Sequence, residues 1–224
     1  FGVAPISQAA SSYAHPIIYL FFGGFVIALA IERSGLHRRV ALNIFSFFGV
    51  NGRSLVGAFM AAAAVISMWI SNTSTTLMLL PIAVSVIVVI RETMTHLDER
   101  TLDNFATSLL LGLAYGATLG GVATLVGTPP NAFMSGFIQA TYDVEIDFAR
   151  WMLVGVPISI VMLPVTWLVL TRFIFPVRFL ASSQAVDHIA GMRRSLGKLS
   201  KAEFRTALVF FALVFGWLFR KPIA

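Results

Sequence analysis

A run of six polar residues lies in the middle of a long apolar segment. The segment covers residues 54–90 and holds no charged side chain, and the run at its centre is Ser71-Asn72-Thr73-Ser74-Thr75-Thr76. A bilayer core contains no water, so polar groups at that depth must pair with protein or with a ligand. A second uncharged segment, residues 105–142, is interrupted by Gly120-Gly121 and then by Gly127-Thr128-Pro129-Pro130-Asn131. Two such breaks are typical of transporters that build their sites from unwound helices.

The composition indicates a membrane protein. The chain is 58% hydrophobic and 12% charged, with a mean hydropathy of +0.86, whereas a soluble domain carries about 25% charged residues. Cysteine is absent, which excludes disulfides and thiolate metal sites. The net charge of +6 comes from basic residues that flank apolar stretches, so it indicates membrane topology and not a nucleic-acid partner. We therefore expect an all-α polytopic membrane protein.

Hydropathy divides the chain into apolar stretches and polar connections. The predicted segments are a first span at residues 16–31, an amphipathic interfacial helix at 36–50, a charged loop at 91–104, a proline-containing span at 151–175, a basic connection at 177–203 and a further span at 204–219. The chain starts without Met or a signal peptide and stops just after an apolar stretch, so we expect an internal piece of a longer protein.

Each polar break has an apolar arm on either side. Arms 105–119 and 131–141 are each too short to cross alone at ~1.5 Å per residue, so we interpret them as one broken span. Arms 54–70 and 75–90 form either a hairpin that dips into the membrane or two full spans joined by an external loop. Both arrangements return the chain to the same face, and we favour the hairpin because of the polar centre of the segment.

The distribution of basic residues predicts the orientation. With the segment 54–90 returning to its starting face and 105–141 crossing once, most Lys and Arg residues fall on one side, which should be cytoplasmic. The basic run 193–201 is interpreted as an anchor near anionic membrane lipid. The opposite side holds the remaining charged residues of these connections, namely Asp143, Glu145, Asp147, Arg150, Arg220 and Lys221.

The motifs resemble those of the divalent anion:sodium symporters, which carry di- and tricarboxylates. The resemblance is carried by Phe22-Gly23-Gly24-Phe25, Leu36-His37-Arg38-Arg39, Ser71-Asn72-Thr73 and the stretch from Gly120 to Asn131, which follow the same order. It implies an inverted-repeat transporter in which each repeat has a re-entrant helical hairpin and a broken transmembrane helix, and it implies a homodimer.

The same resemblance implies the division of this chain. Residues 1–203 would be the first repeat, with its hairpin at 54–90 and its broken helix at 105–141, and residues 204–224 would begin the second repeat. The second hairpin and half of the substrate contacts would then lie beyond the chain, so the fragment by itself should not transport.

The resemblance also implies a sodium site, whose ligands would be Ser67, Ser71, Asn72 and Gly120, with Thr124 as a neighbour. Sodium prefers oxygen ligands, and unwound backbone supplies carbonyls without a formal charge. Glycine at position 120 permits close backbone approach, although Gly112, Gly116 and Gly120 also fit small-residue helix packing.

The substrate-binding residues implied are Asn72 and Thr73, because an amide and a hydroxyl can both donate to a carboxylate. The segment Gly127-Thr128-Pro129-Pro130-Asn131 would support the site. The helix starts at the hairpin tip and after Pro129-Pro130 would point positive dipole ends towards an anion.

The segments 54–90 and 105–142 contain no Asp, Glu, His, Lys or Arg. A proton-driven carrier usually has a titratable group in the membrane, so their absence here favours sodium symport. We expect sodium-coupled transport of dicarboxylates such as succinate, malate or fumarate, and also of tricarboxylates, across a bacterial inner membrane. The alternatives are a permease for sulfate or another oxyanion, or a carboxylate exchanger. An intramembrane enzyme is disfavoured because no base accompanies the hydroxyls.

Overall fold

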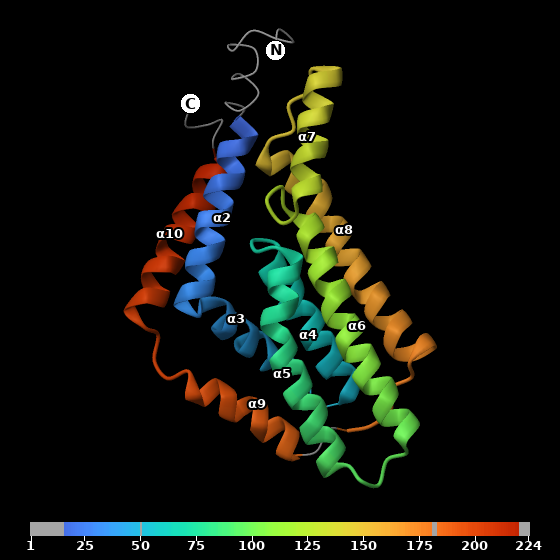
Figure 1. The fold of residues 1–224 in the computed structure, drawn as a ribbon. Coiled ribbons are helices and arrows are strands. Elements are labelled where there is room, and N and C mark those ends of the chain that lie inside the picture. The colour runs from blue at the N-terminus through green and yellow to red at the C-terminus, as the bar shows by residue number, and fades with distance from the viewer. Residues whose placement is uncertain (1–15, 50, 181–182, 220–224) are drawn as a thin grey trace, which may run out of the picture.

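The computed structural model describes residues 16–49, 51–180 and 183–219, and these residues form a helical protein with one isolated bridge between Asn51 and Leu180 (Figure 1). Arg220 and Lys221 of the predicted topology lie outside the described residues. The helices are α2 (Pro16–Ser34), α3 (Leu36–Phe45), α4 (Gly52–Ser67), α5 (Asn72–Thr93), α6 (Glu99–Ala123), α7 (Pro129–Tyr142), α8 (Phe148–Leu168), the π-helical continuation η1 (Val169–Ile174), α9 (Ser183–Ser195) and α10 (Lys201–Leu218).

Three helices are long and apolar enough to cross a membrane, namely α5, α6 and the continuous helix Phe148–Ile174. The helices α2 and α3 would form a fourth span only as a pair, and they are bent by 71° at the break between them. The break is at Gly35, whose φ of 78° lies in the left-handed region that glycine adopts without strain. The chain is therefore an all-α, polytopic membrane protein.

The charged loop predicted at 91–104 is mostly helical, so that prediction is wrong. Helix α5 continues to Thr93 and α6 begins at Glu99, after Asp98 has accepted a hydrogen bond from the Thr101 N–H at 3.2 Å. Arg91 forms ion pairs with Glu99 and with Asp103, so charges that favour a loop by composition stabilise two helix ends instead.

The predicted length of the arm before the second break is also wrong. The arm was assigned to residues 105–119, but α6 has 25 residues and is long enough to cross a membrane by itself. The difference arises because helix α6 incorporates both the polar turn before the arm and the glycine pair after it. The break is confined to residues 124–128.

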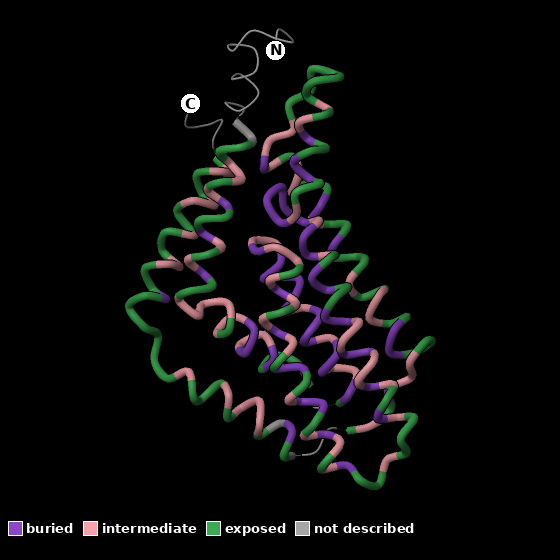
Figure 2. The backbone as a smooth tube through the Cα atoms, in the orientation of Figure 1, coloured by how far each residue is buried: buried purple, intermediate pink, exposed green. Residues whose placement is uncertain are grey.

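The most extensive helix contact is between α4 and α6, and glycines line it. An added Cβ on Gly116 would lie 2.5 Å from the Met60 carbonyl oxygen, and one on Gly120 would lie 2.2 Å from that of Ala64. An added Cβ on Gly112 would lie 3.0 Å from the Met60 side chain. The small-residue packing is confirmed, and the buried residues concentrate along this contact (Figure 2).

Figure 1 shows how these helices place the two breaks. Both outer ends of the α4–α5 pair lie towards the lower end of the molecule, and the connection between them, residues 68–71, lies near mid-height. Helix α7 continues beyond the second break in the general direction of α6. The two breaks in the sequence therefore lie inside the molecule and not at its ends.

Candidate functional site

The tip of the α4–α5 pair is organised by Ser71. Its hydroxyl accepts a hydrogen bond from the Ser74 N–H at 3.2 Å and donates to the Ser74 hydroxyl at 3.0 Å. Its carbonyl accepts from the Thr75 N–H at 2.9 Å. This is the N-cap arrangement that allows a helix to start at Asn72, and it commits the Ser71 hydroxyl locally.

The Asn72 side chain lies between the two broken elements. Its Oδ1 accepts a hydrogen bond from the Ser67 hydroxyl at 2.7 Å. The same oxygen lies only 2.3 Å from the point that a Cβ on Gly121 would occupy, so it fills the space left by the missing side chain. The Asn72 Nδ2 group donates to no residue in the described part of the chain. The amide therefore presents its oxygen to α4 and α6 and keeps its donors available.

Thr124, which is fully buried, links the second break to the first by hydrogen bonds. The Thr124 hydroxyl donates to the Met68 carbonyl at 2.5 Å and accepts from the Gly127 N–H at 3.0 Å. One side chain thus joins the hairpin tip to the connection between α6 and α7. These two hydrogen bonds give Thr124 a structural role at the junction, and its expected place beside the sodium ion stays a prediction.

Side chains donate hydrogen bonds to several carbonyls near the end of α6. Asn131 donates both amide hydrogens, to the Gly121 carbonyl at 2.8 Å and to the Thr124 carbonyl at 2.7 Å. The remaining donors come from α8, where the Ser159 hydroxyl binds the Leu119 carbonyl at 2.6 Å and the Trp151 indole binds the Val122 carbonyl at 2.9 Å. Side-chain donors therefore reach the Leu119, Gly121 and Val122 carbonyls, which helps α6 to end inside the protein.

Two other carbonyls near this junction, those of Gly120 and Ser67, lack such side-chain donors in the described part of the chain. Within the described residues, no side-chain donor reaches the Gly120 carbonyl, and no hydrogen bond of any kind reaches the Ser67 carbonyl. An unpaired buried carbonyl costs free energy unless a ligand completes it. Neutral oxygens gathered at a helix break are the donor set that suits a sodium ion.

The structure places the other predicted residues as follows. Thr73 is exposed at the hairpin tip, and Thr128 is the N-cap of α7 without a side-chain capping bond. Pro129 and Pro130 occupy the first two helical positions and have no N–H, and the Asn131 N–H donates to the Thr128 carbonyl. The start of α7 consequently has no free N–H at its first three positions, so it would act on an anion through its dipole alone.

Sequence reasoning did not single out Thr75. Its side chain is fully buried, and its Oγ1 is the only buried side-chain oxygen or nitrogen in the described residues without a hydrogen-bond partner. The signal was present, because Thr75 lies one helical turn after Ser71 in the same polar run. Trp151 and Ser159 were also missed, since their function depends on how α8 packs against α6.

The described residues contain no group of three or more His, Asp or Glu side chains that could hold a metal ion. The two breaks instead gather backbone carbonyls, hydroxyls and amides. Such a site can bind a monovalent cation through oxygens, and it can bind an anion through amide and hydroxyl donors.

Residues 2–224 match the family model described as the sodium:sulfate symporter transmembrane region. The chain belongs to this family. The resemblance to divalent anion:sodium symporters that the motifs carry is therefore confirmed over nearly the whole sequence, and the sodium:sulfate symporter family is one of membrane transporters and not of enzymes.

Two curated proteins are similar to this chain over most of its length. The chain is 35% identical over 205 residues to the sodium-dependent dicarboxylate transporter SdcS of Staphylococcus aureus (strain USA300), with 90% of this chain and 38% of the relative covered. It is 36% identical over 217 residues to the protein of the same name from Staphylococcus saprophyticus, with 96% and 41% covered. The chain thus spans about two fifths of the length of these relatives.

Proposed function

We propose that this chain is part of a carrier that moves dicarboxylates such as succinate, malate or fumarate into the cell together with sodium. The observation that supports the proposal best is the position of Asn72, whose Oδ1 faces Ser67 and Gly121 while its Nδ2 donates to no residue in the described part of the chain. The names of the two relatives support the same substrate class and the same coupling ion.

The sodium site in this proposal is formed by the backbone carbonyls of Ser67, Ser71 and Gly120 and by the side-chain oxygen of Asn72. All of these donors are neutral, as a monovalent cation in a membrane requires if the substrate is to supply the negative charge. Thr124 would position the hairpin tip. The segment 127–131 would stabilise the end of α6 beside the site, since its Asn131 donates hydrogen bonds to the neighbouring carbonyls of Gly121 and Thr124.

The substrate carboxylate would accept hydrogen bonds from the Asn72 amide and from the exposed Thr73 hydroxyl, near the positive end of α5. Sodium bound to the Asn72 oxygen holds the amide plane and thereby aims the Nδ2 donors. Binding of the two ligands is then cooperative and reciprocal, because each one stabilises the same rotamer.

The proposal also covers the architecture of the chain and the oligomeric state and membrane of the complete protein. The α4–α5 pair would be a re-entrant hairpin corresponding to segment 54–90, α6 and α7 would form the broken helix of 105–141, and residues 1–203 would be the first of two inverted repeats. The complete protein would be a homodimer in a bacterial inner membrane with its basic connections on the cytoplasmic side.

The test is uptake of labelled succinate by the full-length protein in liposomes. An inward sodium gradient should drive accumulation, and replacing sodium by potassium on both sides should abolish it. Uptake that is equal in potassium, or that responds to a proton gradient alone, would contradict sodium coupling. Exchange only against internal substrate would instead identify a carboxylate exchanger.

A second candidate substrate is sulfate or another oxyanion, because the family description names sodium:sulfate symport. Sulfate carries its two charges on one compact tetrahedral group, whereas a dicarboxylate carries them on two separate groups, the second of which needs its own set of donors. Competition distinguishes them: a tenfold excess of unlabelled fumarate should suppress succinate uptake and the same excess of sulfate should not. Citrate in the same assay tests whether tricarboxylates are also bound.

A further inference from the structure

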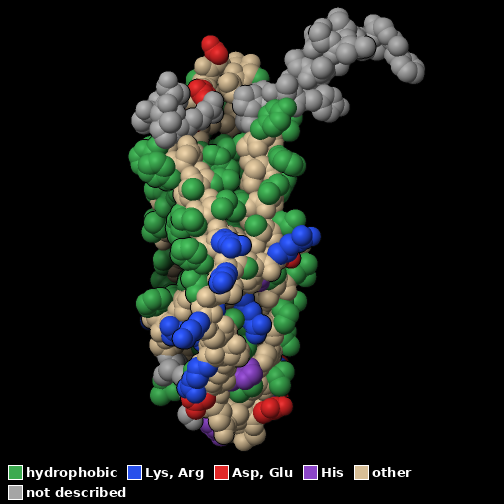
Figure 3. Space-filling view, turned by 90° about the vertical axis from the view of Figure 1, so that its left-hand side faces the viewer, with side chains coloured by type: hydrophobic (Ala, Val, Ile, Leu, Met, Phe, Trp, Pro, Cys, Tyr) green, Lys and Arg blue, Asp and Glu red, His purple; other side chains and the backbone are tan. Residues whose placement is uncertain are grey.

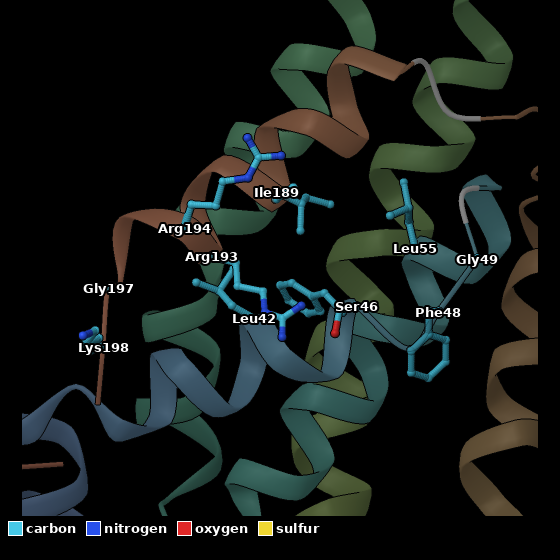
Figure 4. A pocket seen from close by; sticks show the side chains of 12 residues that line it. Leu42, Ser46, Phe48, Gly49, Leu55, Ile189, Arg193, Arg194, Gly197 and Lys198 are labelled. Carbon is cyan, nitrogen blue, oxygen red and sulfur yellow. The ribbon is translucent and has the colours of Figure 1, made fainter. Parts of the chain in front are cut away.

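A cavity of about 710 Å³ lies away from the proposed transport site, between α3, the start of α4, α9 and the connection from α9 to α10 (Figure 4). Its volume falls within the range of roughly 300–1,000 Å³ that small-molecule sites in proteins occupy. Leu42, Phe45 and Leu55 form a buried apolar floor. Ile189 lines the opposite side on α9, and Phe48 lies at the exposed edge.

Three cations border this apolar cavity. Arg193, Arg194 and Lys198 are all exposed, and none of their side chains forms a hydrogen bond or an ion pair with another described residue. Figure 4 shows Arg193 extending from α9 across the cavity towards Ser46, the residue after the end of α3. Figure 3 shows Lys and Arg gathered on the lower half of the same face of the molecule, below a surface rich in hydrophobic side chains.

The wall that carries the cations is held firmly in place. Arg39 of α3 donates to Glu203 at 2.7 Å and to the carbonyls of Leu196 and Gly197, each at 3.1 Å. The hydrogen bonds from Arg39 lower the pKa of Glu203 to about 2, so the carboxylate stays charged at neutral pH. The connection between α9 and α10 is therefore fixed to α3, and this wall of the cavity has a defined position.

The other side of the cavity is fixed to the α4–α5 pair. Phe45 of α3 packs against Phe59 of α4 with ring centroids 4.3 Å apart. His188 of α9 and Ser85 of α5 share a hydrogen bond of 2.7 Å. Anything that fills the cavity consequently ties α3 to α9 beside the base of the proposed hairpin.

We propose that this cavity binds an anionic phospholipid. The headgroup phosphate would lie against Arg193, Arg194 and Lys198, and an acyl chain would lie on the floor formed by Leu42 and Phe45. A free anion would leave the apolar floor exposed to water, and a neutral lipid would leave three cations uncompensated. Basic pockets between helices at a membrane surface suit anionic lipid headgroups.

The test measures lipid retention on the purified full-length protein by native mass spectrometry, with phosphatidylglycerol and phosphatidylcholine added to detergent micelles. The wild type should retain phosphatidylglycerol about tenfold more tightly than phosphatidylcholine. The triple variant Arg193→Gln, Arg194→Gln, Lys198→Gln should lose this preference. A matched control with the same change of charge at exposed positions outside the cavity is Arg100→Gln, Arg172→Gln, Lys201→Gln, and it should keep the preference.

A filling variant tests the apolar floor separately. Ala190→Phe places a ring at the cavity wall while keeping all three cations, so it should also lose phosphatidylglycerol. Each variant is first shown to melt at the wild-type temperature. The proposal is overturned if the wild type retains both lipids equally, if the cationic variant and its control behave alike, or if glycerol phosphate displaces the lipid at equal concentration, which would indicate a site for a free anion.

Discussion

At the scale of single residues, Gly121 decides where the Asn72 amide can lie. A methyl group on residue 121 would lie 2.3 Å from the Asn72 Oδ1, well inside van der Waals contact, so the amide must move. We predict that Gly121→Ala lowers sodium-driven succinate uptake by about 100-fold, the loss that a displacement of ~1 Å can cause. Initial rates at varied sodium concentration measure the effect. Gly191→Ala is the control, since its Cβ meets nothing within 4 Å, and equal rates for both variants would contradict the role of Asn72.

Thr75 is the second residue with a specific prediction, because its buried hydroxyl has no partner among the described residues. Thr75→Val keeps the shape and removes the unpaired group, so the sodium-free protein should become more stable by about 1 kcal/mol. Thr75→Ser keeps the hydroxyl and should not share that gain. Thermal unfolding of the full-length protein in detergent measures both. A loss of stability in Thr75→Val would indicate that the hydroxyl is bonded in the complete protein.

At the scale of elements, the close approach of α4 to α6 depends on glycines, because an added Cβ at these positions would force the two helices apart. Gly116→Ala and Gly120→Ala each bring a Cβ against a carbonyl oxygen of α4, and we predict a destabilisation of about 1–3 kcal/mol for each. Denaturation midpoints of the full-length variants give the measurement. The exposed helix position Gly191 should tolerate alanine, and an equal loss there would show that the effect is not one of helix approach.

The pairing of Arg39 with Glu203 connects α3, α9 and α10, and its contribution depends on pH. The folded-state pKa of Glu203 is lowered from 4.5 to about 2 by the hydrogen bonds from Arg39, so the pair stabilises the protein above about pH 4.5 and loses this contribution as the pH falls towards 2. Glu203→Gln should therefore melt at a lower temperature than the wild type at pH 7. The difference between the two proteins should narrow as the pH falls below 4, and a constant difference would exclude the ionised pair as its cause.

At the scale of the whole molecule, the position of the hairpin tip distinguishes a binding site from an external loop. Thr73 is exposed at the tip, and Asp143 lies in the connection between α7 and α8. In a cysteine-free background, labelling of Thr73→Cys by a membrane-impermeant thiol reagent should be slowed at least several-fold by saturating sodium and succinate. Labelling of Asp143→Cys should be unaffected. If ligands leave both labelling rates unchanged, the tip is not at the site.

Much of the fold followed from hydropathy. The apolar first helix, an amphipathic helix after it and two polar breaks are present, because charge and apolar periodicity are local properties of the chain. The amphipathic helix ends at Phe45 and not at residue 50, and the second break excludes the glycine pair Gly120-Gly121. The helix ends at Thr93, Glu99 and Ala123 were not predicted. Each of them depends on a partner elsewhere, such as the ion pairs of Arg91 or the donors that Asn131, Trp151 and Ser159 present to α6.

The sequence by itself determined that this chain spans membranes, that two uncharged segments carry polar breaks and that the motifs are those of anion:sodium symporters. Only the tertiary structure decided what each polar group of those breaks does. It made Ser71 a helix cap, used Thr124 to join the two breaks and placed the Asn72 oxygen against Gly121. Among the described residues it left the Thr75 hydroxyl without a partner. The reason is that a polar side chain in a dry interior is defined by its partner, and these partners lie on helices far apart in the sequence.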